Sequence, residues 1–303
     1  MTEPELRRTQ LATPASDEKM MHNAANSDAD EVFLDLEDSV APSEKAAARD
    51  PLIQALREED WSDKIVSFRI NGIDTQWWYD DLITVVTEAG DVLDDIIVPK
   101  VKSASDIHTV ANLLEQVEVN ADLEVGGIGL EPQIEDGQGM HNVHEIAHSS
   151  DRLSSVIFGP GDYSAAMGTP GLDIGQFPDY PGHYWHYALS HINAAAKSAD
   201  LPCIDGPYAD IQDEEGFRQS CANASMLGCD GKWAIHPSQI EIANEVFAPD
   251  PEVADRAKRI VDAYAEAMEE GKGAVSVDGQ MVDEATNKMA QDIVARAKAA
   301  GIL

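Results

Sequence analysis

Charged or polar residues follow nearly every short apolar stretch of this 303-residue sequence. In order along the chain they are Asp35, Glu37, Asp38, Arg69, Lys100, Glu135, Asp162, Asp205 and His236. A single acid in such a place often caps a helix, but the repeated pattern predicts one shared pocket. Because a small pocket cannot hold so many carboxylates unpaired, we expect a divalent cation there, with Arg and Lys partners.

The elements that would position these residues alternate regularly. Short β-branched runs and longer amphipathic stretches follow one another at roughly thirty-residue spacing, the length of a strand-plus-helix unit. The expected strands are residues 9–14, 31–36, 64–70, 95–101, 125–134, 154–158, 201–204 and 232–235, with helices between them, for example over 103–117. Eight alternating strands predict an α/β fold, a (β/α)8 TIM barrel, whose catalytic residues lie at the carboxyl ends of the strands. An open doubly wound sheet is the alternative, but no Gly-x-Gly-x-x-Gly follows the first strand.

The chain continues beyond the eighth unit, so we expect a barrel domain over residues 1–249 and a C-terminal helical extension over 250–303. The extension contains a helix over about 252–270, a Gly-rich stretch with the turn pair Asp278-Gly279, and an amphipathic helix over about 282–299. It is longer than a barrel requires. We therefore expect it to pack on its own barrel or to reach a neighbouring subunit.

The composition excludes several classes of function. The chain carries 56 acidic and 21 basic residues, a formal net charge of −35, which would repel nucleic acid and anionic membranes. The acids are spread along the chain, which is typical of a halophilic protein whose self-repulsion is screened by salt. No apolar stretch approaches the ~20 residues of a membrane span, and the start lacks a signal-peptide pattern. We expect a cytoplasmic protein with three ordinary buried cysteines.

Six motifs together resemble the citrate lyase β-subunit-like (HpcH/HpaI aldolase) family. They are residues 33–42 (FLDLEDSVAP), 69–72 (RING), 98–101 (VPKV), 158–163 (FGPGDY), 204–207 (IDGP) and 231–237 (GKWAIHP). The loop over 168–187 and the Lys232-Trp233-Ala234 run are most similar to the malyl-CoA and β-methylmalyl-CoA lyase branch, of the haloarchaeal type. The resemblance implies a Mg²⁺-dependent carbon–carbon lyase. Its expected reaction is the reversible cleavage of L-malyl-CoA or β-methylmalyl-CoA to glyoxylate and acetyl-CoA or propionyl-CoA.

The resemblance also implies roles for particular residues. The family's Mg²⁺ ligands, which Mn²⁺ could also occupy, correspond to Glu135 and Asp162; Glu131 is a nearby alternative, but the spacing after Glu135 matches the family. The substrate arginine corresponds to Arg69. The general acid/base corresponds to Asp283, supplied by an adjacent subunit of a homotrimer or homohexamer. Positions that bind substrate or support these groups are expected to be Asp35, Glu37, Asp38 and Lys100.

One departure from the family concerns the end of the first strand. The family has a Pro-Gly-x-Arg-Pro context there, whereas residues 13–18 of this chain read TPASDE without an arginine. The contacts to the acyl-CoA are therefore not mapped by the resemblance. Alternatives that stay open are a citramalyl-CoA or citryl thioester lyase, a malyl-CoA thioesterase giving net malate synthesis, and a non-catalytic CoA-binding subunit.

Three histidines invite a zinc interpretation. His141, His144 and His148 fall on one side of an expected helix, but no fourth ligand is evident, and a solvated face explains them more simply.

Overall fold

A computed structural model describes residues 5–169 and 185–303 of the chain. Most of the loop over 168–187 that marks the family branch therefore lies outside the described residues. The chain divides into two compact units. One is Arg7–Asn244, and the other is Glu245–Leu303 together with the N-terminal residues up to Leu6.

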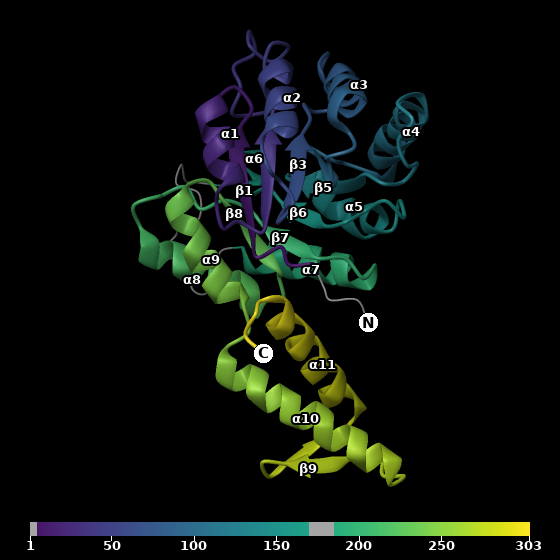
Figure 1. Cartoon of the computed structure of the whole chain (residues 1–303), viewed down its shortest axis with the longest axis vertical. Coiled ribbons are helices and arrows are strands. Elements are labelled where there is room, and N and C mark those ends of the chain that lie inside the picture. Colours follow the sequence, from purple (N-terminus) through teal and green to yellow (C-terminus); the bar gives the residue numbers. More distant parts are fainter. Residues whose placement is uncertain (1–4, 170–184) are drawn as a thin grey trace. The chain divides into compact units, whose positions relative to one another are not determined.

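The first unit is a closed barrel of eight parallel strands in sequential order (Figure 1). Pairing of the first strand with the last closes it, with Thr9 opposite Lys232 and Leu11 opposite Ala234. The strands are β1 Thr9–Pro14, β2 Glu31–Asp35, β3 Ile65–Arg69, β4 Asp95–Val98, β5 Gly129–Ile134, β6 Val156–Phe158, β7 Cys203–Asp205 and β8 Gly231–Ala234. The predicted TIM barrel is confirmed.

Helices connect successive strands on the outside of the barrel (Figure 1). They are α1 Glu18–Ala25, α2 Arg49–Glu58, α3 Trp78–Ala89, α4 Ala104–Asn120, α5 Gly137–Ala147, α6 Pro160–Met167, α7 His186–Ser198, α8 Glu214–Met226, the 3₁₀ turn Pro237–Gln239 and α9 Ile240–Phe247. Helix α4 shows why such boundaries are readable from sequence. Ser103 and Asp106 form a reciprocal capping box at its start. The helix therefore begins at Ala104, one residue after the start of the predicted helical segment.

Strands β4 and β5 are shorter than predicted by three and four residues, the largest differences among the eight, and left-handed residues explain both. Strand β4 ends at Val98 instead of residue 101, because Lys100 has a φ of 55° that cannot continue a strand. Strand β5 begins at Gly129 instead of residue 125. Asp122 and Gly126 both have positive φ, and Glu118 accepts a hydrogen bond from the Gly126 N–H at 3.0 Å, which holds this loop out of the sheet.

Side chains from alternating positions fill the barrel interior in layers. One layer consists of Phe33, Ile97, Ile157, Ile204 and Trp233, all buried. Removing each large apolar side chain from water contributes roughly 1.5–3 kcal/mol, so this layer is a substantial part of the core.

A buried ionic cluster fills the opposite, amino-terminal end of the barrel. Arg7 donates to Glu31 at 2.9 Å, to Asp95 at 2.7 Å and to Glu131 at 2.8 Å. Burial and the neighbouring carboxylate of Glu31 raise the pKa of Glu131 well above its usual range, and Arg7 only partly opposes this shift. The barrel is therefore closed at this end.

The second unit is a helical hairpin with a small sheet. It contains α10 Pro251–Glu269, the antiparallel strands β9 Val275–Val277 and β10 Gln280–Val282, and α11 Glu284–Ala299. Asp278 and Gly279 have φ values of 49° and 77°, the left-handed pair that a tight hairpin turn requires, so the predicted turn is confirmed. Strand β10 includes Val282, and the last helix begins two residues later than predicted. The two units divide inside α9, and the assignment of residues 250–303 as a functional lid stays a prediction.

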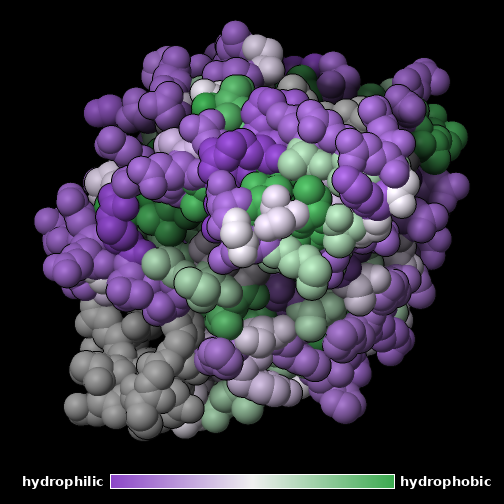
Figure 2. All heavy atoms as spheres, turned by 90° about the horizontal axis from the view of Figure 1, so that it is seen from below, coloured by the Kyte–Doolittle hydropathy of each residue, from purple (hydrophilic) through white to green (hydrophobic). Residues whose placement is uncertain are grey.

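Hydrophilic residues cover most of the described surface on the face drawn in Figure 2, with smaller apolar areas between them. This agrees with the excess of acidic side chains. None of the described helices combines the length and the apolar character needed to cross a membrane.

Candidate active site

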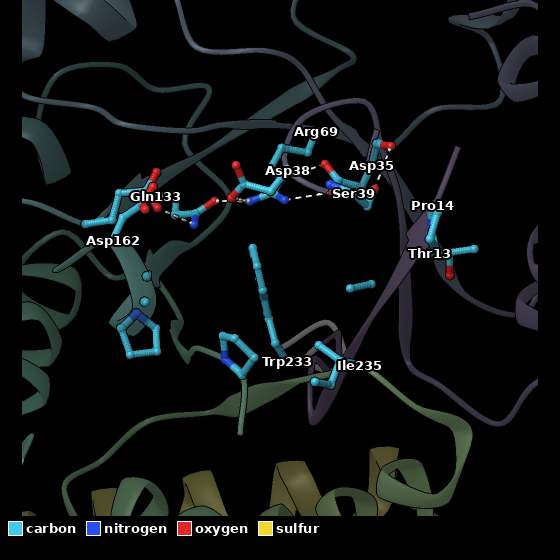
Figure 3. Close-up of a pocket in the computed structure, with 16 residues that line it drawn as sticks. Thr13, Pro14, Asp35, Asp38, Ser39, Arg69, Gln133, Asp162, Trp233 and Ile235 are labelled. Atoms are coloured by element: carbon cyan, nitrogen blue, oxygen red, sulfur yellow. Dashed lines mark hydrogen bonds and ion pairs between the residues drawn. The ribbon is translucent and has the colours of Figure 1, made fainter. Parts of the chain in front are cut away.

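A cavity of about 440 Å³ lies where the carboxyl ends of the barrel strands meet. Of the residues predicted to carry chemistry, Asp35, Asp38, Arg69, Glu135 and Asp162 line it. Figure 3 shows Asp162, Gln133, Arg69 and Asp35 in a row, with Trp233 pointing toward that row from β8. These five strand-end residues therefore share one site, as expected for the carboxyl ends of barrel strands.

Arg69, the last residue of β3, is held from several sides. Its Nε and Nη2 donate to the two carboxylate oxygens of Asp35 at 2.7 and 2.8 Å, a bidentate pair. Its Nη1 donates to Gln133 Oε1 at 3.3 Å and lies 3.2 Å from Glu37 Oε2. Burial raises the pKa of Asp35, but Arg69 and the hydrogen bonds to Asp35 outweigh it and lower that pKa to about 2. Arg69 is thus a fixed, permanently charged group.

Glu135 follows β5 and is almost fully buried. Its Oε1 accepts from the backbone N–H of Lys100 at 2.6 Å, and its Oε2 accepts from Gln133 Nε2 at 2.8 Å. Burial raises the pKa of Glu135 to about 8; Glu37 and Asp162 add to the rise, whereas Arg69 and the Lys100 N–H oppose it. The left-handed conformation of Lys100 is what directs its N–H toward this carboxylate.

The side chain of Lys100 joins three carboxylates that follow two different strands, β2 and β6. Its Nζ makes a very short hydrogen bond to Glu37 and lies 3.4 Å from Asp162 Oδ2 and 3.7 Å from Asp38 Oδ1. Partial burial lowers the pKa of Lys100, but Glu37, Asp38 and Asp162 outweigh it and raise that pKa above its usual value.

The charges around the cavity do not balance. Five carboxylates and three cations converge there: Asp35, Glu37, Asp38, Glu135, Asp162, Arg69, Lys100 and, behind Glu37, Lys45. Moreover, Glu37 Oε2 and Asp162 Oδ2 are buried and accept no hydrogen bond from the described residues. With all five carboxylates ionised, the site has an excess of two negative charges. A divalent, oxygen-preferring cation fits this excess and the unshared oxygen lone pairs, and it would favour the ionised form of Glu135.

The structure separates Glu131 from Glu135, the two candidate ligands on β5. Glu131 is bound to Arg7 at 2.8 Å and accepts a very short hydrogen bond from Ser155 in the ionic cluster at the closed end. Glu135 lines the cavity with Asp162. The geometry therefore supports Glu135.

Asp283 belongs to the C-terminal unit and not to the barrel. It is exposed and caps the start of α11, accepting from the Thr286 N–H at 2.9 Å, and these hydrogen bonds lower its pKa. Its predicted role as a general acid/base stays a prediction.

Two other strand-end residues have structural partners. Asp205 forms a buried ion pair with Lys232, and His236 pairs through Nδ1 with the Ser238 hydroxyl at 2.9 Å. Of the histidines that suggested zinc, His144 lies against the His191 ring with centroids 5.3 Å apart, and His148 contacts Ser198 Oγ at 3.0 Å. In residues 5–169 and 185–303, no group of three or more His, Cys, Asp or Glu side chains is placed to hold a metal ion, so a metal in the cavity would have two carboxylate ligands from the protein.

Sequence reasoning missed two residues of the cavity, Gln133 and Trp233. Gln133 bridges Arg69 and Glu135, and the sequence pattern of β5 could have predicted its position. Glu131, Gln133 and Glu135 alternate along β5, and a period of two places them on one face of the strand. Trp233 was noted only as part of a family motif, and its position in the cavity depends on the register of β8 with β1.

Comparisons with known proteins agree with this fold. Residues 8–237 match the HpcH/HpaI aldolase/citrate lyase family. The chain is 40% identical over 301 residues to the L-malyl-CoA/β-methylmalyl-CoA lyase of Cereibacter sphaeroides, covering 96% of this chain and 94% of the relative. It is 34% identical over 299 residues to the citrate lyase subunit β of Leuconostoc mesenteroides, covering 99% and 96%. The solved structure of CitE from Mycobacterium tuberculosis with magnesium, acetoacetate and coenzyme A is also similar, with 27% identity, a TM-score of 0.76, and coverage of 96% and 97%.

The chain therefore belongs to the HpcH/HpaI aldolase/citrate lyase family. The relatives are named lyases, and the prediction of a lyase is confirmed at the level of this class.

Proposed function

We propose that this chain is a Mg²⁺-dependent carbon–carbon lyase. Its proposed reaction is the reversible cleavage of L-malyl-CoA or β-methylmalyl-CoA to glyoxylate and acetyl-CoA or propionyl-CoA. The observation that carries the proposal is the meeting of Arg69, Glu135 and Asp162 in one cavity with unbalanced negative charge. The relative with 40% identity that is named for this reaction supports the choice of substrate.

Glu135 and Asp162 would hold the metal, because both line the cavity and Asp162 Oδ2 accepts no hydrogen bond from the described side chains. The bound ion, Mg²⁺ or Mn²⁺ as a substitute, supplies Lewis-acid polarisation of the oxygens of the oxo-acid portion. The magnesium in the similar CitE complex is consistent with this assignment.

The remaining groups act on charge and protons. In cleavage the hydroxyl loses its proton to solvent and its oxygen becomes the carbonyl oxygen of glyoxylate. The bond between the hydroxyl-bearing carbon and the α-carbon of the thioester breaks, and its electron pair is left on a thioester enolate. Arg69, buried and held by Asp35, presents fixed positive charge where oxyanion charge develops. Asp283 of an adjacent subunit gives a proton to the enolate carbon, and removes it in the direction of condensation.

Two other enzyme reactions share this site chemistry. A citramalyl-CoA or citryl thioester lyase differs in the size of the oxo product. The similarity to a citrate lyase subunit supports this reaction as the alternative. A malyl-CoA thioesterase adds hydrolysis. A non-catalytic CoA-binding subunit would have little reason to keep Arg69, Glu135 and Asp162 together.

A paired assay on malyl-CoA with Mg²⁺ and concentrated KCl separates these reactions. Glyoxylate is measured as its phenylhydrazone and free CoA as its thiol. We expect glyoxylate without free thiol. Free thiol without glyoxylate would instead establish a thioesterase, and no product in either assay would contradict the proposed substrate.

The proposed setting is a homotrimer or homohexamer in the cytoplasm of a cell with concentrated salt. The extension and the acidic surface support it. Gel filtration in molar KCl tests the assembly, and an active monomer would contradict a site shared between subunits.

A further inference from the structure

The cavity has two chemically different sides. In Figure 3, Trp233 and Ile235 lie opposite the polar row. The apolar residues Ala12 and Pro207 also line the cavity. Trp233 is the largest of these side chains and only 4% exposed. Its indole ring therefore determines much of the depth of the cavity on the apolar side.

A glutamine from the layer below fixes the orientation of this ring. Trp233 Nε1 donates to Gln10 Oε1 at 2.6 Å. The amide of Gln10 cannot be reversed, because its Nε2 donates to Glu31 Oε2 at 2.7 Å and to Glu131 Oε1 at 3.0 Å, which are both carboxylate acceptors. Gln10 itself is fully buried.

The ring is also held on its faces. The centroid of the Trp233 ring lies 4.5 Å from the centroid of the Phe33 ring. The guanidinium carbon of Arg69 lies 5.3 Å from the centroid of the Trp233 ring. Rotation of the indole would break the bond to Gln10 and the cation–π contact to Arg69 together. The position of the cavity wall is thus coupled to the ionic cluster at the closed end of the barrel.

We propose that Trp233 determines the size of the acyl group that this enzyme accepts, and that Gln10 is a positioning residue that keeps the wall in place. This inference rests on the proposed function. A malyl-type thioester has a charged oxo-acid end and an apolar acyl end. The charged oxo-acid end fits the polar row, because Arg69 lies there. The carbons of the acyl end therefore face Trp233.

The test compares acetyl-CoA, propionyl-CoA and butyryl-CoA in condensation with glyoxylate. Trp233→Phe replaces the indole by a smaller ring and removes the Nε1–H, and Gln10→Leu removes the hydrogen-bond partner of the indole at a residue that does not line the cavity. One methylene in an apolar pocket changes kcat/KM by about 10–200-fold. We therefore expect the ratio of kcat/KM for butyryl-CoA over acetyl-CoA to rise about tenfold in Trp233→Phe. It should shift in the same direction in Gln10→Leu.

Trp61→Phe is the matched control. Trp61 is equally buried, at 5% exposure, and its Nε1 donates to the Ala55 carbonyl at 3.2 Å, outside the cavity. This variant loses an indole hydrogen bond without altering the wall, so it should be less stable but keep the wild-type ratio. An unchanged ratio in Trp233→Phe, or an equal change in Trp61→Phe, would overturn the proposal.

Calorimetric binding of the same three thioesters distinguishes this proposal from the proposed function. Suppose that the wild-type protein turns over none of them but Trp233→Phe still shifts the order of affinities toward butyryl-CoA. The proposed lyase reaction is then contradicted, whereas the role of Trp233 in acyl-group size is supported. If the wild-type protein turns them over, and Trp233→Phe changes neither the kcat/KM ratio nor the affinity ratio of butyryl-CoA over acetyl-CoA, the role of Trp233 is contradicted and the proposed function is not. A wild-type protein that neither binds nor converts these thioesters contradicts both.

Discussion

The pair formed by Arg69 and Asp35 is the most tightly fixed contact of the candidate site. Asp35 accepts from Arg69 through both oxygens and also from the backbone N–H groups of Glu37 and Ser39, at 2.8 and 3.0 Å. All four lone-pair directions of the carboxylate are therefore used within the protein. This explains why Asp35 positions Arg69 and is not itself available for proton transfer.

The first prediction concerns the acid stability that this pair provides. The pKa of Asp35 falls from 3.8 to about 2 on folding. A carboxyl whose pKa is lowered by folding stabilises the protein above its unfolded pKa and loses that contribution as the pH falls through the folded pKa. The shift corresponds to roughly 2 kcal/mol. We expect the difference in unfolding free energy between the wild-type protein and Asp35→Asn to shrink by this amount between about pH 5 and pH 2, measured by urea denaturation. A difference independent of pH would contradict the assignment.

The second prediction concerns Asp283. Replacing it with Asn removes the proton donor but preserves its size and its position at the start of α11. We expect turnover to fall by about 10²-fold or more, whereas Mg²⁺ affinity, measured by calorimetry, stays at the wild-type value. Near-normal turnover would exclude Asp283 as the general acid/base, and a loss of metal binding would show that the variant disturbs the barrel.

At the scale of elements, the metal ligands depend on how closely β5 and β6 approach. Gly159 follows β6, and a Cβ added there would lie 2.6 Å from Glu135 Cβ and 2.7 Å from Glu135 Oε2. The absence of a side chain at Gly159 is therefore what leaves room for the Glu135 carboxylate.

The third prediction follows from this approach. Gly159→Ala should displace Glu135 and weaken Mg²⁺ binding by roughly 10–100-fold, as expected when a group that orients a metal ligand is disturbed. Titration calorimetry measures the change. Gly137→Ala is the control, because its added Cβ would meet Met167 Sδ at an ordinary 3.4 Å. Equal affinities in both variants would contradict the role of Glu135 as a ligand.

The elements also show what could be predicted from sequence and what could not. All eight strands were located, because each contains a short apolar run that is recognisable from its local sequence, although several of their ends were not. The meeting of Asp35, Arg69, Glu135 and Asp162 followed, since parallel strands in a barrel end at one face. The left-handed turn at Lys100 was not predictable, because its N–H is bound by a carboxylate from another strand. The Trp233–Gln10 bond was not predictable either, since it joins residues 223 positions apart.

At the scale of the whole molecule, the dominant property is the net charge of −35. The screening length falls from about 10 Å at 0.1 M salt to about 3 Å at 1 M. The repulsion between acidic side chains is therefore strong in dilute buffer and weak in concentrated salt.

The fourth prediction is that concentrated KCl stabilises the protein. We expect the thermal unfolding midpoint, followed by circular dichroism, to rise between 0.1 and 2 M KCl, because salt screens the repulsion that favours unfolding. Sorbitol at equal osmolality should produce a smaller rise. A midpoint independent of KCl would contradict the proposed adaptation to salt.

The ionic cluster around Arg7 has a consequence for biosynthesis. Arg7 leaves the ribosome long before its partners at positions 31, 95 and 131. Strand β1 pairs with β8 at Lys232–Ala234, so this pairing forms only after β8 has been synthesised. At ~5–20 residues per second, translation takes about 5–20 s to proceed from Glu131 to β8. During that interval Arg7 and its three partners have all been synthesised, whereas the first strand still lacks β8 at one of its edges. An open strand edge is where mispairing begins, so this interval is when the newly made chain most needs protection.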